Sequence, residues 1–127
     1  MSFISLSPET SKGQSIGTGH CVPYVQQASK APATAQWKKG KKVKGDLTIL
    51  KGTAIATFSA DGKYTNSVDG TSHAAIYLRQ DATAIYVLDQ WINRDNTKQP
   101  VHERAIRFQG GKIGTVNDGD NYYVVEQ

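Results

Sequence analysis

Residues 17–30 read GTGHCVPYVQQASK, and this stretch decides where the main helix of the chain begins and where its chemistry can occur. Apolar residues recur in it every three or four positions, which is the spacing of one buried helix face. Pro23 is compatible with the first turn of a helix, where its missing N–H costs little. Pro32 ends the helix, because the residue before a proline avoids the helical region. We therefore predict a helix that carries Cys21 in its first turn and ends before Pro32.

Cys21 is the only cysteine in the sequence. A thiol in the first turn of a helix lies beside unpaired backbone N–H groups and the positive end of the helix dipole, and both stabilise the thiolate. This placement favours a nucleophilic role for Cys21. The alternative is that Cys21 is a small buried apolar residue, as most free cysteines are.

Length and composition indicate a single domain. The chain has 127 residues, enough for one hydrophobic core, and we expect residues 1–127 to form one domain with a polar N-terminal arm at 1–16. The formal net charge of +4 suits anionic partners, such as a bacterial cell wall, a nucleic acid or an acidic protein.

The sequence also limits the possible crosslinks and the compartment. A single cysteine cannot form an internal disulfide. The N-terminal residues lack the basic start and the apolar core of a secretory signal peptide. No run approaches the length of about 20 apolar residues that a bilayer-spanning helix needs. We therefore expect a protein that is made in the cytoplasm, carries no signal peptide and does not insert into a membrane.

Residues 38–45 form the most basic stretch of the chain and contain five lysines. Charge runs of this kind are usually solvated loops, and the alternative is a surface that attracts a polyanion. No aromatic residue lies within the run, so the stacking on bases that supports nucleic-acid binding is missing. We therefore expect a solvated loop here and no nucleic-acid partner.

From Thr53 onward the sequence changes to short apolar runs separated by turn residues, which is typical of β-strands. Residues 33–37 are expected to add a short helical turn before them, and Asp61-Gly62 is a strong signal for a turn between strands. The resulting fold class is α+β, with an N-terminal helix that carries the cysteine packed on an antiparallel β-meander. The expected strands are 53–58, 73–78, 84–91, 101–108 and 122–125, with a polar loop at 93–100.

A thiol nucleophile needs a base, and the base needs a group that orients it. The sequence offers three histidines. His20 adjoins Cys21, but adjacent residues of a helix point in different directions, so His20 is expected on the rim of the site. His102 begins a charged strand and is expected to be exposed. His73 opens an apolar strand, where it can face a helix N-terminus as in cysteine hydrolases, and we predict His73 as the base.

Hairpin geometry identifies candidates for the orienting group, because facing residues of an antiparallel pair are fixed by the length of the turn. A three-residue turn at 80–82 places Asp89 opposite His73, and a two-residue turn at 81–82 places Gln90 there. We prefer Asp89, because a carboxylate stabilises an imidazolium better than an amide does and would be costly on an apolar strand without a partner. The alternatives are Gln90, or an Asp89 that only marks the solvent end of the strand.

Further expectations concern the surroundings of the thiol. The backbone N–H of Cys21 and the side-chain amide of Gln14 are candidate donors to an oxyanion. One cysteine and three scattered histidines lack the spacing of metal ligands, so we expect no metal site and no cofactor. Trp37, Trp91 and Tyr24 are expected to line the core or the cleft.

Several segments in combination resemble the small papain-like amidases. They are the helix start at 19–22, Trp37 with Gly40, and the strands at 52–58, 73–78 and 87–91. Among these amidases the sequence is most similar to the second family of type VI secretion amidase effectors. The resemblance runs from about Gly17 to Phe108, which is most of the chain.

The resemblance implies a papain-like fold, related to the CHAP and NlpC hydrolases of peptidoglycan. It implies an antibacterial toxin that a type VI secretion apparatus injects into the periplasm of a neighbouring Gram-negative cell. There the toxin cleaves peptide stems or crosslinks of peptidoglycan, at the diaminopimelate–D-alanine bond, and a cognate periplasmic immunity protein protects the producer. By position, Cys21 matches the nucleophile, His73 the general base and Asp89 the orienting group.

Two other functions remain compatible with the sequence. One is a cysteine-dependent deamidase or transglutaminase-like toxin that acts on a protein. The other is a wall-binding module without catalysis, in which Cys21 is simply buried.

Overall fold

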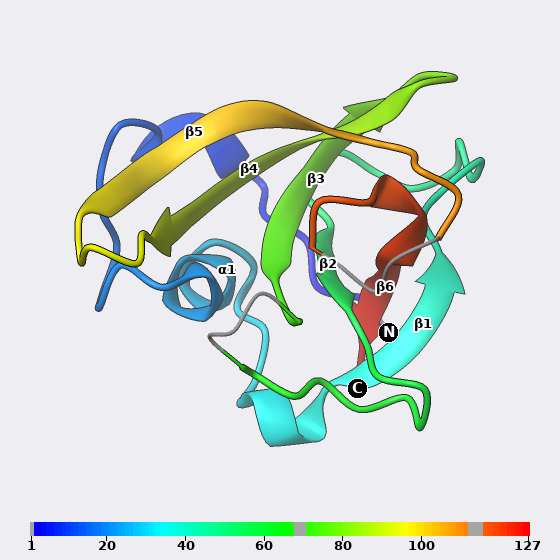
Figure 1. Cartoon of the computed structure of the whole chain (residues 1–127), viewed down its shortest axis with the longest axis horizontal. Helices are drawn as coiled ribbons and strands as arrows, with labels where there is room; N and C mark the ends of the chain where they lie inside the picture. Colours follow the sequence, from blue (N-terminus) through cyan, green and yellow to red (C-terminus); the bar gives the residue numbers. More distant parts are fainter. Residues whose placement is uncertain (1, 68–70, 112–115) are drawn as a thin grey trace.

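Helix α1 (Cys21–Ser29) packs on an antiparallel sheet of six strands in the computed structural model, which describes residues 2–67, 71–111 and 116–127 (Figure 1). The sheet order is β1-β6-β2-β3-β4-β5. The strands are β1 (Lys38–Lys42), β2 (Ala54–Thr57), β3 (Ala74–Gln80), β4 (Ala84–Ile92), β5 (Lys98–Arg107) and β6 (Tyr122–Glu126). Short 3-10 turns are present at Pro8–Ser11, Thr34–Gln36 and Gly119–Asn121. Within the described ranges, no helix is long and apolar enough to cross a membrane.

Helix α1 begins where the sequence predicted, with Cys21 as its first residue. Val22 and Val25 are buried on the face that packs toward β3 and β4. The helix ends at Ser29, and its C-cap residue Lys30 adopts the left-handed conformation with a φ of 62° and donates its N–H to the carbonyl of Gln26. The expected α+β fold, with the cysteine helix packed on an antiparallel sheet, is confirmed.

The alternation of side chains along the strands divides the core into two layers. Ala54, Ala56 and Ala74 lie in the layer that also contains the buried hydrophobic residues of α1. Ile55 points to the opposite face, where it joins a second buried cluster that includes Tyr122. Because both faces are covered, β2 and β3 are apolar throughout most of their length and show no clean alternation in sequence.

The expected meander is only partly correct. Strands β2 to β5 are neighbours in sequence order, but β6 returns to lie between β1 and β2. Residues 38–45 were expected to form a solvated loop, and this was wrong because they contain the edge strand β1. The lysines of β1 are exposed, and lysines on an edge strand discourage pairing with other chains. At the centre of β1, a Cβ atom on Gly40 would lie 2.5 Å from the Val124 carbonyl oxygen, so glycine is required there.

A short helical turn is confirmed at Thr34–Gln36. The start of one strand and the setting of one turn differ from expectation. Strand β5 begins at Lys98, inside the segment expected to be a polar loop, and it tolerates Pro100 because it is an edge strand. Asp61-Gly62 does lie in a turn, which is closed by the Ser59 N–H donating to the carbonyl of Lys63. The turn lies within the connection from β2 to β3 and does not lead directly into a strand.

The N-terminal segment contacts the sheet at both of its ends. Ile4 forms an isolated antiparallel bridge with Thr53, just before β2. Further along, the Gly13 N–H donates to the carbonyl of Val101 on β5. The segment therefore crosses the molecule from the β2 side to β5 before the chain enters α1.

The loop that precedes α1 is fixed to β4 by the side chain of Gln90. The Gln90 side-chain nitrogen donates to the carbonyls of Ile16, at 2.8 Å, and His20, at 2.7 Å. Its oxygen accepts the Ile16 N–H at 2.8 Å. Gln90 has no exposed surface, so these backbone groups satisfy all the polar atoms of a buried amide. They also fix the position of the residue directly before Cys21.

We predict that Gln90→Leu lowers the free energy of unfolding by about 3 kcal/mol, because buried backbone groups lose their partners while the side-chain volume changes little. Urea denaturation followed by circular dichroism measures the change. Gln27→Leu is the matched control, since Gln27 is exposed on α1, and it should change stability by less than about 0.5 kcal/mol. Equal values for the two variants would contradict a structural role for the Gln90 bonds.

Candidate active site

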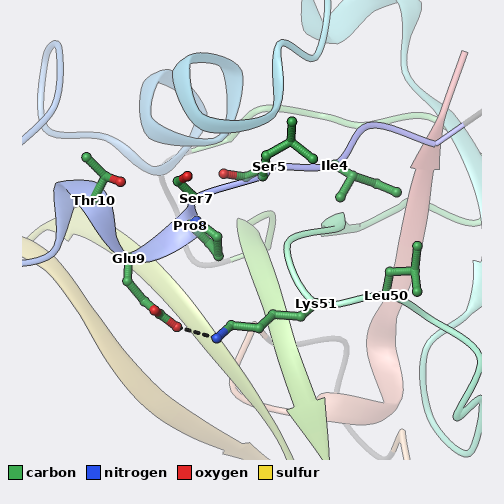
Figure 2. A pocket seen from close by; sticks show the side chains of 9 residues that line it. Ile4, Ser5, Ser7, Pro8, Glu9, Thr10, Leu50 and Lys51 are labelled. Carbon is green, nitrogen blue, oxygen red and sulfur yellow. Dashed lines mark ion pairs between the residues drawn. The ribbon is translucent and has the colours of Figure 1, made fainter.

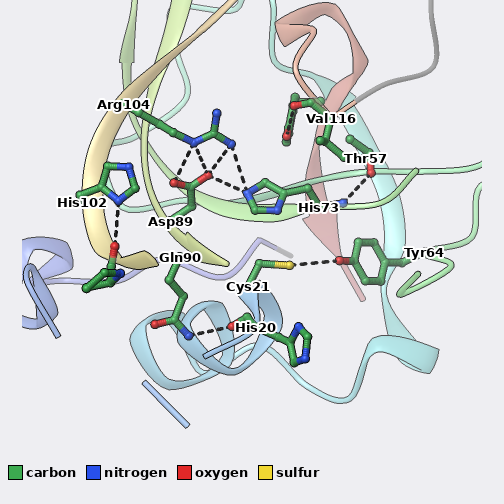
Figure 3. Close-up of polar contacts among 12 residues, drawn as sticks. His20, Cys21, Thr57, Tyr64, His73, Asp89, Gln90, His102, Arg104 and Val116 are labelled. Carbon is green, nitrogen blue, oxygen red and sulfur yellow. Dashed lines mark hydrogen bonds and ion pairs between the residues drawn. The ribbon is translucent and has the colours of Figure 1, made fainter. Parts of the chain in front are cut away.

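Cys21 lies at the N-terminus of α1, beside a cleft in the surface (Figure 3). His20 precedes it as the N-cap residue, in an extended conformation. Gly19 has a φ of 95°, a conformation that suits glycine and turns the chain into the helix. The Cys21 thiol is half-buried, and its sulfur lies 3.7 Å from the hydroxyl of Tyr64. The predicted placement of the thiol at a helix start is confirmed.

His73 lies directly before β3, with its ring between Cys21 and Asp89 (Figure 3). Its backbone N–H donates to the hydroxyl of Thr57 at 3.0 Å, which fixes the residue to β2. Its Nε2 lies 2.6 Å from Oδ2 of Asp89. A carboxylate can only accept, so Nε2 carries a proton and the other ring nitrogen is free to face the thiol.

Asp89 is a fully buried carboxylate on β4. Besides His73, it binds Arg104 of β5, whose Nε lies 2.8 Å from Oδ2 and 3.0 Å from Oδ1. A terminal guanidinium nitrogen, Nη2, lies 2.7 Å from Oδ2. The guanidinium also stacks on Trp91, with 4.9 Å between the carbon centre and the ring centroid. The buried charge is therefore matched by charged and hydrogen-bonding partners.

The turn lengths considered from sequence, at 80–82 and at 81–82, are both wrong. Gln80 pairs with Ile85, and a register shift follows between Tyr77 and Arg79. The Asp81 side chain accepts from the N–H groups of Thr83 and Ala84, which draws the turn toward β4.

The observed register changes which residues face each other. Ile76 pairs with Leu88, and extending this register by one residue places Asp89 opposite Ala75. His73 is then a diagonal neighbour of Asp89 on the same face, a separation that long side chains bridge. The predicted contact between His73 and Asp89 is present, but it arises from a diagonal pair.

Asp89 and Gln90 are separated by the alternation of side chains along β4, because neighbouring residues of a strand point to opposite faces. The Asp89 carboxylate binds the imidazole of His73. The Gln90 amide points the other way and binds the backbone before α1. Of the two alternatives, the structure therefore places Asp89 at the histidine ring and Gln90 at the helix start.

The electrostatics favour a charged pair of thiolate and imidazolium. Burial opposes ionisation of Cys21, but hydrogen bonding and charge attraction from His73, with the Ala74 N–H, outweigh it and lower the pKa of the thiol. Burial likewise opposes charging of His73, but its bonds to Asp89 and Cys21 prevail and raise its pKa to about 9. Burial also disfavours the Asp89 charge, yet His73 and Arg104 lower the pKa of that carboxyl.

The cleft beside the thiol carries basic and polar side chains. Among the residues that the structure describes, no aspartate or glutamate lines it, and no three His, Cys, Asp or Glu side chains gather as metal ligands. The lining residues are His20, Cys21, Ser67, Ser72, His73, Trp91, Ile92, Asn93, Arg94, Arg104, Val116 and Asn117.

The other sequence candidates lie at the edge of the cleft or outside it. His20 is exposed on the rim, as predicted. His102 is half-buried and not exposed as expected, because its ring packs against Trp91 at 5.2 Å. Gln14 is exposed and is not among the residues that line the cleft. Trp91 lines the cleft, whereas Trp37 and Tyr24 are buried in the core.

Sequence reasoning missed Arg104 and Tyr64. Arg104 belongs to a strand with several charged residues, and nothing in the sequence separates it from exposed Arg107 on the same strand. Tyr64 lies between strands, where its distance from Cys21 along the chain gives no signal. Both are brought to the site by the packing of segments that are distant in sequence.

A second hollow lies between the N-terminal segment and the loop before β2 (Figure 2). Leu6 and Leu50 are exposed beside it. The ammonium of Lys51 forms an ion pair of 2.6 Å with Glu9 at its edge. None of the residues that line it belongs to the cluster around Cys21, so the thiol cleft is the candidate active site.

Comparisons with known proteins agree with this geometry. Residues 2–125 match the model of the family domesticated amidase effector 2. A type VI secretion amidase effector 2 protein from Salmonella typhi is 33% identical over 123 residues, covering 89% of this chain and 90% of the relative. A solved structure of type 6 secretion amidase effector 2 superposes with a TM-score of 0.81 at 29% identity, covering 98% of this chain and 94% of that one. The chain belongs to the family of type VI secretion amidase effector 2 proteins.

Proposed function

We propose that this protein is a peptidoglycan amidase that uses Cys21 as its nucleophile and acts as an antibacterial toxin delivered by a type VI secretion apparatus. Membership of the amidase effector family supports hydrolysis of an amide bond. The observation that carries the assignment of residues is that Cys21 and His73 line one cleft, where Nε2 of His73 lies 2.6 Å from Oδ2 of Asp89. This is the order of groups that a cysteine hydrolase needs: nucleophile, base and orienting group.

The first half of the reaction forms a thioester. The Cys21 thiolate attacks the carbonyl carbon of the amide, and the imidazolium of His73 gives its proton to the leaving nitrogen. The carbon–nitrogen bond then breaks, which releases the amine and leaves the acyl group on sulfur. The backbone N–H of Cys21, at the first position of α1, has no partner within the helix and stabilises the oxyanion.

The second half restores the enzyme with one water molecule. Neutral His73 removes a proton from water, the resulting hydroxide attacks the thioester, and the carbon–sulfur bond breaks. The products are a carboxylic acid, which then releases its proton to water, and the Cys21 thiolate beside a protonated His73. Asp89 accepts from Nε2 throughout, so the ring keeps its free nitrogen toward the thiol.

The cleft suits an anionic peptide. Arg94 is exposed on its rim, and within the described part of the chain no carboxylate residue lines it. Peptide stems of peptidoglycan carry free carboxylates, and the proposed target is the diaminopimelate–D-alanine crosslink. The proposed place of action is the periplasm of a neighbouring Gram-negative cell. A cognate immunity protein in the producer's own periplasm is proposed to protect the producer.

We predict that Cys21→Ala abolishes cleavage of purified Gram-negative sacculi, with a fall in rate of at least about 10⁴-fold, because the nucleophile is lost. Mass spectrometry of the released muropeptides measures the rate and identifies the bond. Circular dichroism should show an unchanged fold, since a half-buried thiol is replaced by a smaller apolar group.

Ser15→Ala serves as a control in the same loop, because Ser15 is exposed and does not line the cleft, and it should retain wild-type activity. Cleavage by Cys21→Ala at the wild-type rate would exclude the proposed nucleophile. Sacculi that stay intact with active wild-type protein, while a glutamine on a target protein changes mass, would identify a deamidase.

The dependence of kcat/KM on pH should be bell-shaped. Activity rises as Cys21 loses its proton, below the ordinary thiol pKa, because His73 lowers that value. It falls again as the imidazolium loses its proton, with a midpoint near 9, because the raised pKa of His73 keeps the proton donor charged up to that pH. An alkaline limb near the ordinary histidine pKa of about 6.5 would contradict the proposed contact with Asp89.

A further inference from the structure

The guanidinium of Arg104 contacts both carboxylate oxygens of Asp89. Its Nε lies within hydrogen-bonding distance of both carboxylate oxygens, and its Nη2 lies 2.7 Å from Oδ2, the oxygen that also accepts from His73. The side chain of Arg104 is 20% exposed, at the wall of the cleft, whereas that of Asp89 has no exposed surface. Trp91 packs against the guanidinium and limits its movement. The carboxylate is therefore held from β5 as well as from the histidine.

The same guanidinium lies close to the imidazole. Nη2 of Arg104 is 3.5 Å from Nε2 of His73 (Figure 3). Both nitrogens are donors when Nε2 keeps its proton and donates a hydrogen bond to Asp89, so they do not hydrogen-bond to each other. When His73 is protonated the two are like charges, and Arg104 opposes the imidazolium that Asp89 favours.

We propose that Arg104 is a positioning residue that acts through Asp89, fixing both oxygens of the carboxylate and cancelling its charge so that His73 is paired with an orienting group that is nearly neutral. The proposal rests on the proposed function, because it concerns the same cluster. It explains why the orienting group is an aspartate in an apolar strand. The carboxylate accepts strongly from Nε2, but its net charge is balanced from β5.

The other titratable groups around the cluster do not supply this balance. Three buried tyrosines lie nearby: Tyr24 on α1, Tyr64 between β2 and β3, and Tyr122 on β6. Burial raises the pKa of each, so their hydroxyls stay neutral. Their hydroxyls interact with the Pro8 carbonyl, the Cys21 sulfur and the Val116 carbonyl. His102 of β5 faces Trp91, and its Nδ1 lies 2.8 Å from the Pro100 carbonyl. Arg94 and His20 are exposed on the rim of the cleft.

A charge cycle tests the proposal with Asp89→Asn and Arg104→Gln, made singly and together. Asp89→Asn leaves the Arg104 cation beside His73 without its counter-charge, so kcat/KM should fall by at least about 100-fold. Adding Arg104→Gln removes the opposing cation, so kcat/KM of the double variant should be about tenfold higher than that of Asp89→Asn. Arg104→Gln alone leaves a buried carboxylate without its cation and is the variant most exposed to unfolding. The comparison therefore rests on Asp89→Asn against the double variant.

A second measurement does not depend on activity. The chain has three histidines, so the His73 ring can be followed by NMR titration, with Cys21→Ala in every variant to remove the coupled thiol. The pKa of His73 should fall in Asp89→Asn and rise again by about one unit in the double variant. If wild-type protein leaves sacculi intact, the proposed function fails, but this titration still decides whether Arg104 acts on His73.

Two further variants act as controls. Arg107→Gln removes an exposed arginine from the same strand and should change neither activity nor the His73 titration. Arg104→Lys keeps the positive charge but loses the planar guanidinium that binds both carboxylate oxygens. The His73 pKa should therefore stay near the wild-type value, while kcat falls and KM does not change. Additive losses of activity in the cycle, with equal His73 titrations in Asp89→Asn and the double variant, would overturn the proposal.

Discussion

The rest of the structure depends on one buried charge, the carboxylate of Asp89. A carboxylate without exposed surface is costly unless partners reach it, so β3, β4 and β5 must align closely enough to bring His73 and Arg104 to the same oxygen atoms. That alignment fixes the imidazole ring, and the ring in turn faces the thiol at the start of α1. Sheet packing and the electrostatics of the cleft are thus set by the same group.

Asp89 and its neighbour Gln90 point to opposite faces of β4 and bind different partners there. The carboxylate orients the ring on one face, and the amide binds the backbone that leads into α1 on the other. Two consecutive residues therefore position both halves of the proposed catalytic pair relative to the same strand. Because Asp89 and Gln90 are consecutive residues, a change in the register of β4 would displace the His73 ring and the start of α1 together.

The charge balance of the cluster suits hydrolysis through a thiolate. The His73 contact lowers the pKa of the thiol, and the pKa of His73 is raised, so each member of the pair stabilises the charge of the other. By neutralising Asp89, Arg104 limits how far the carboxylate stabilises the imidazolium. The basic rim of the cleft stays available to an anionic substrate. These features agree with membership of the amidase effector family, in a fold that shares its overall arrangement with a solved relative.

The sequence by itself determined the helix that starts at Cys21, the five strands β2 to β6, and the choice of His73 and Asp89 as candidates, because periodicity, proline and isolated polar residues in apolar runs are local signals. It did not reveal β1, since a lysine-rich edge strand looks like a solvated loop. Only the tertiary structure decided the register of β3 and β4, the return of β6, and the approach of Arg104 and Tyr64 to the site. These features depend on turn geometry and on contacts between distant segments, and no local pattern of residues encodes them.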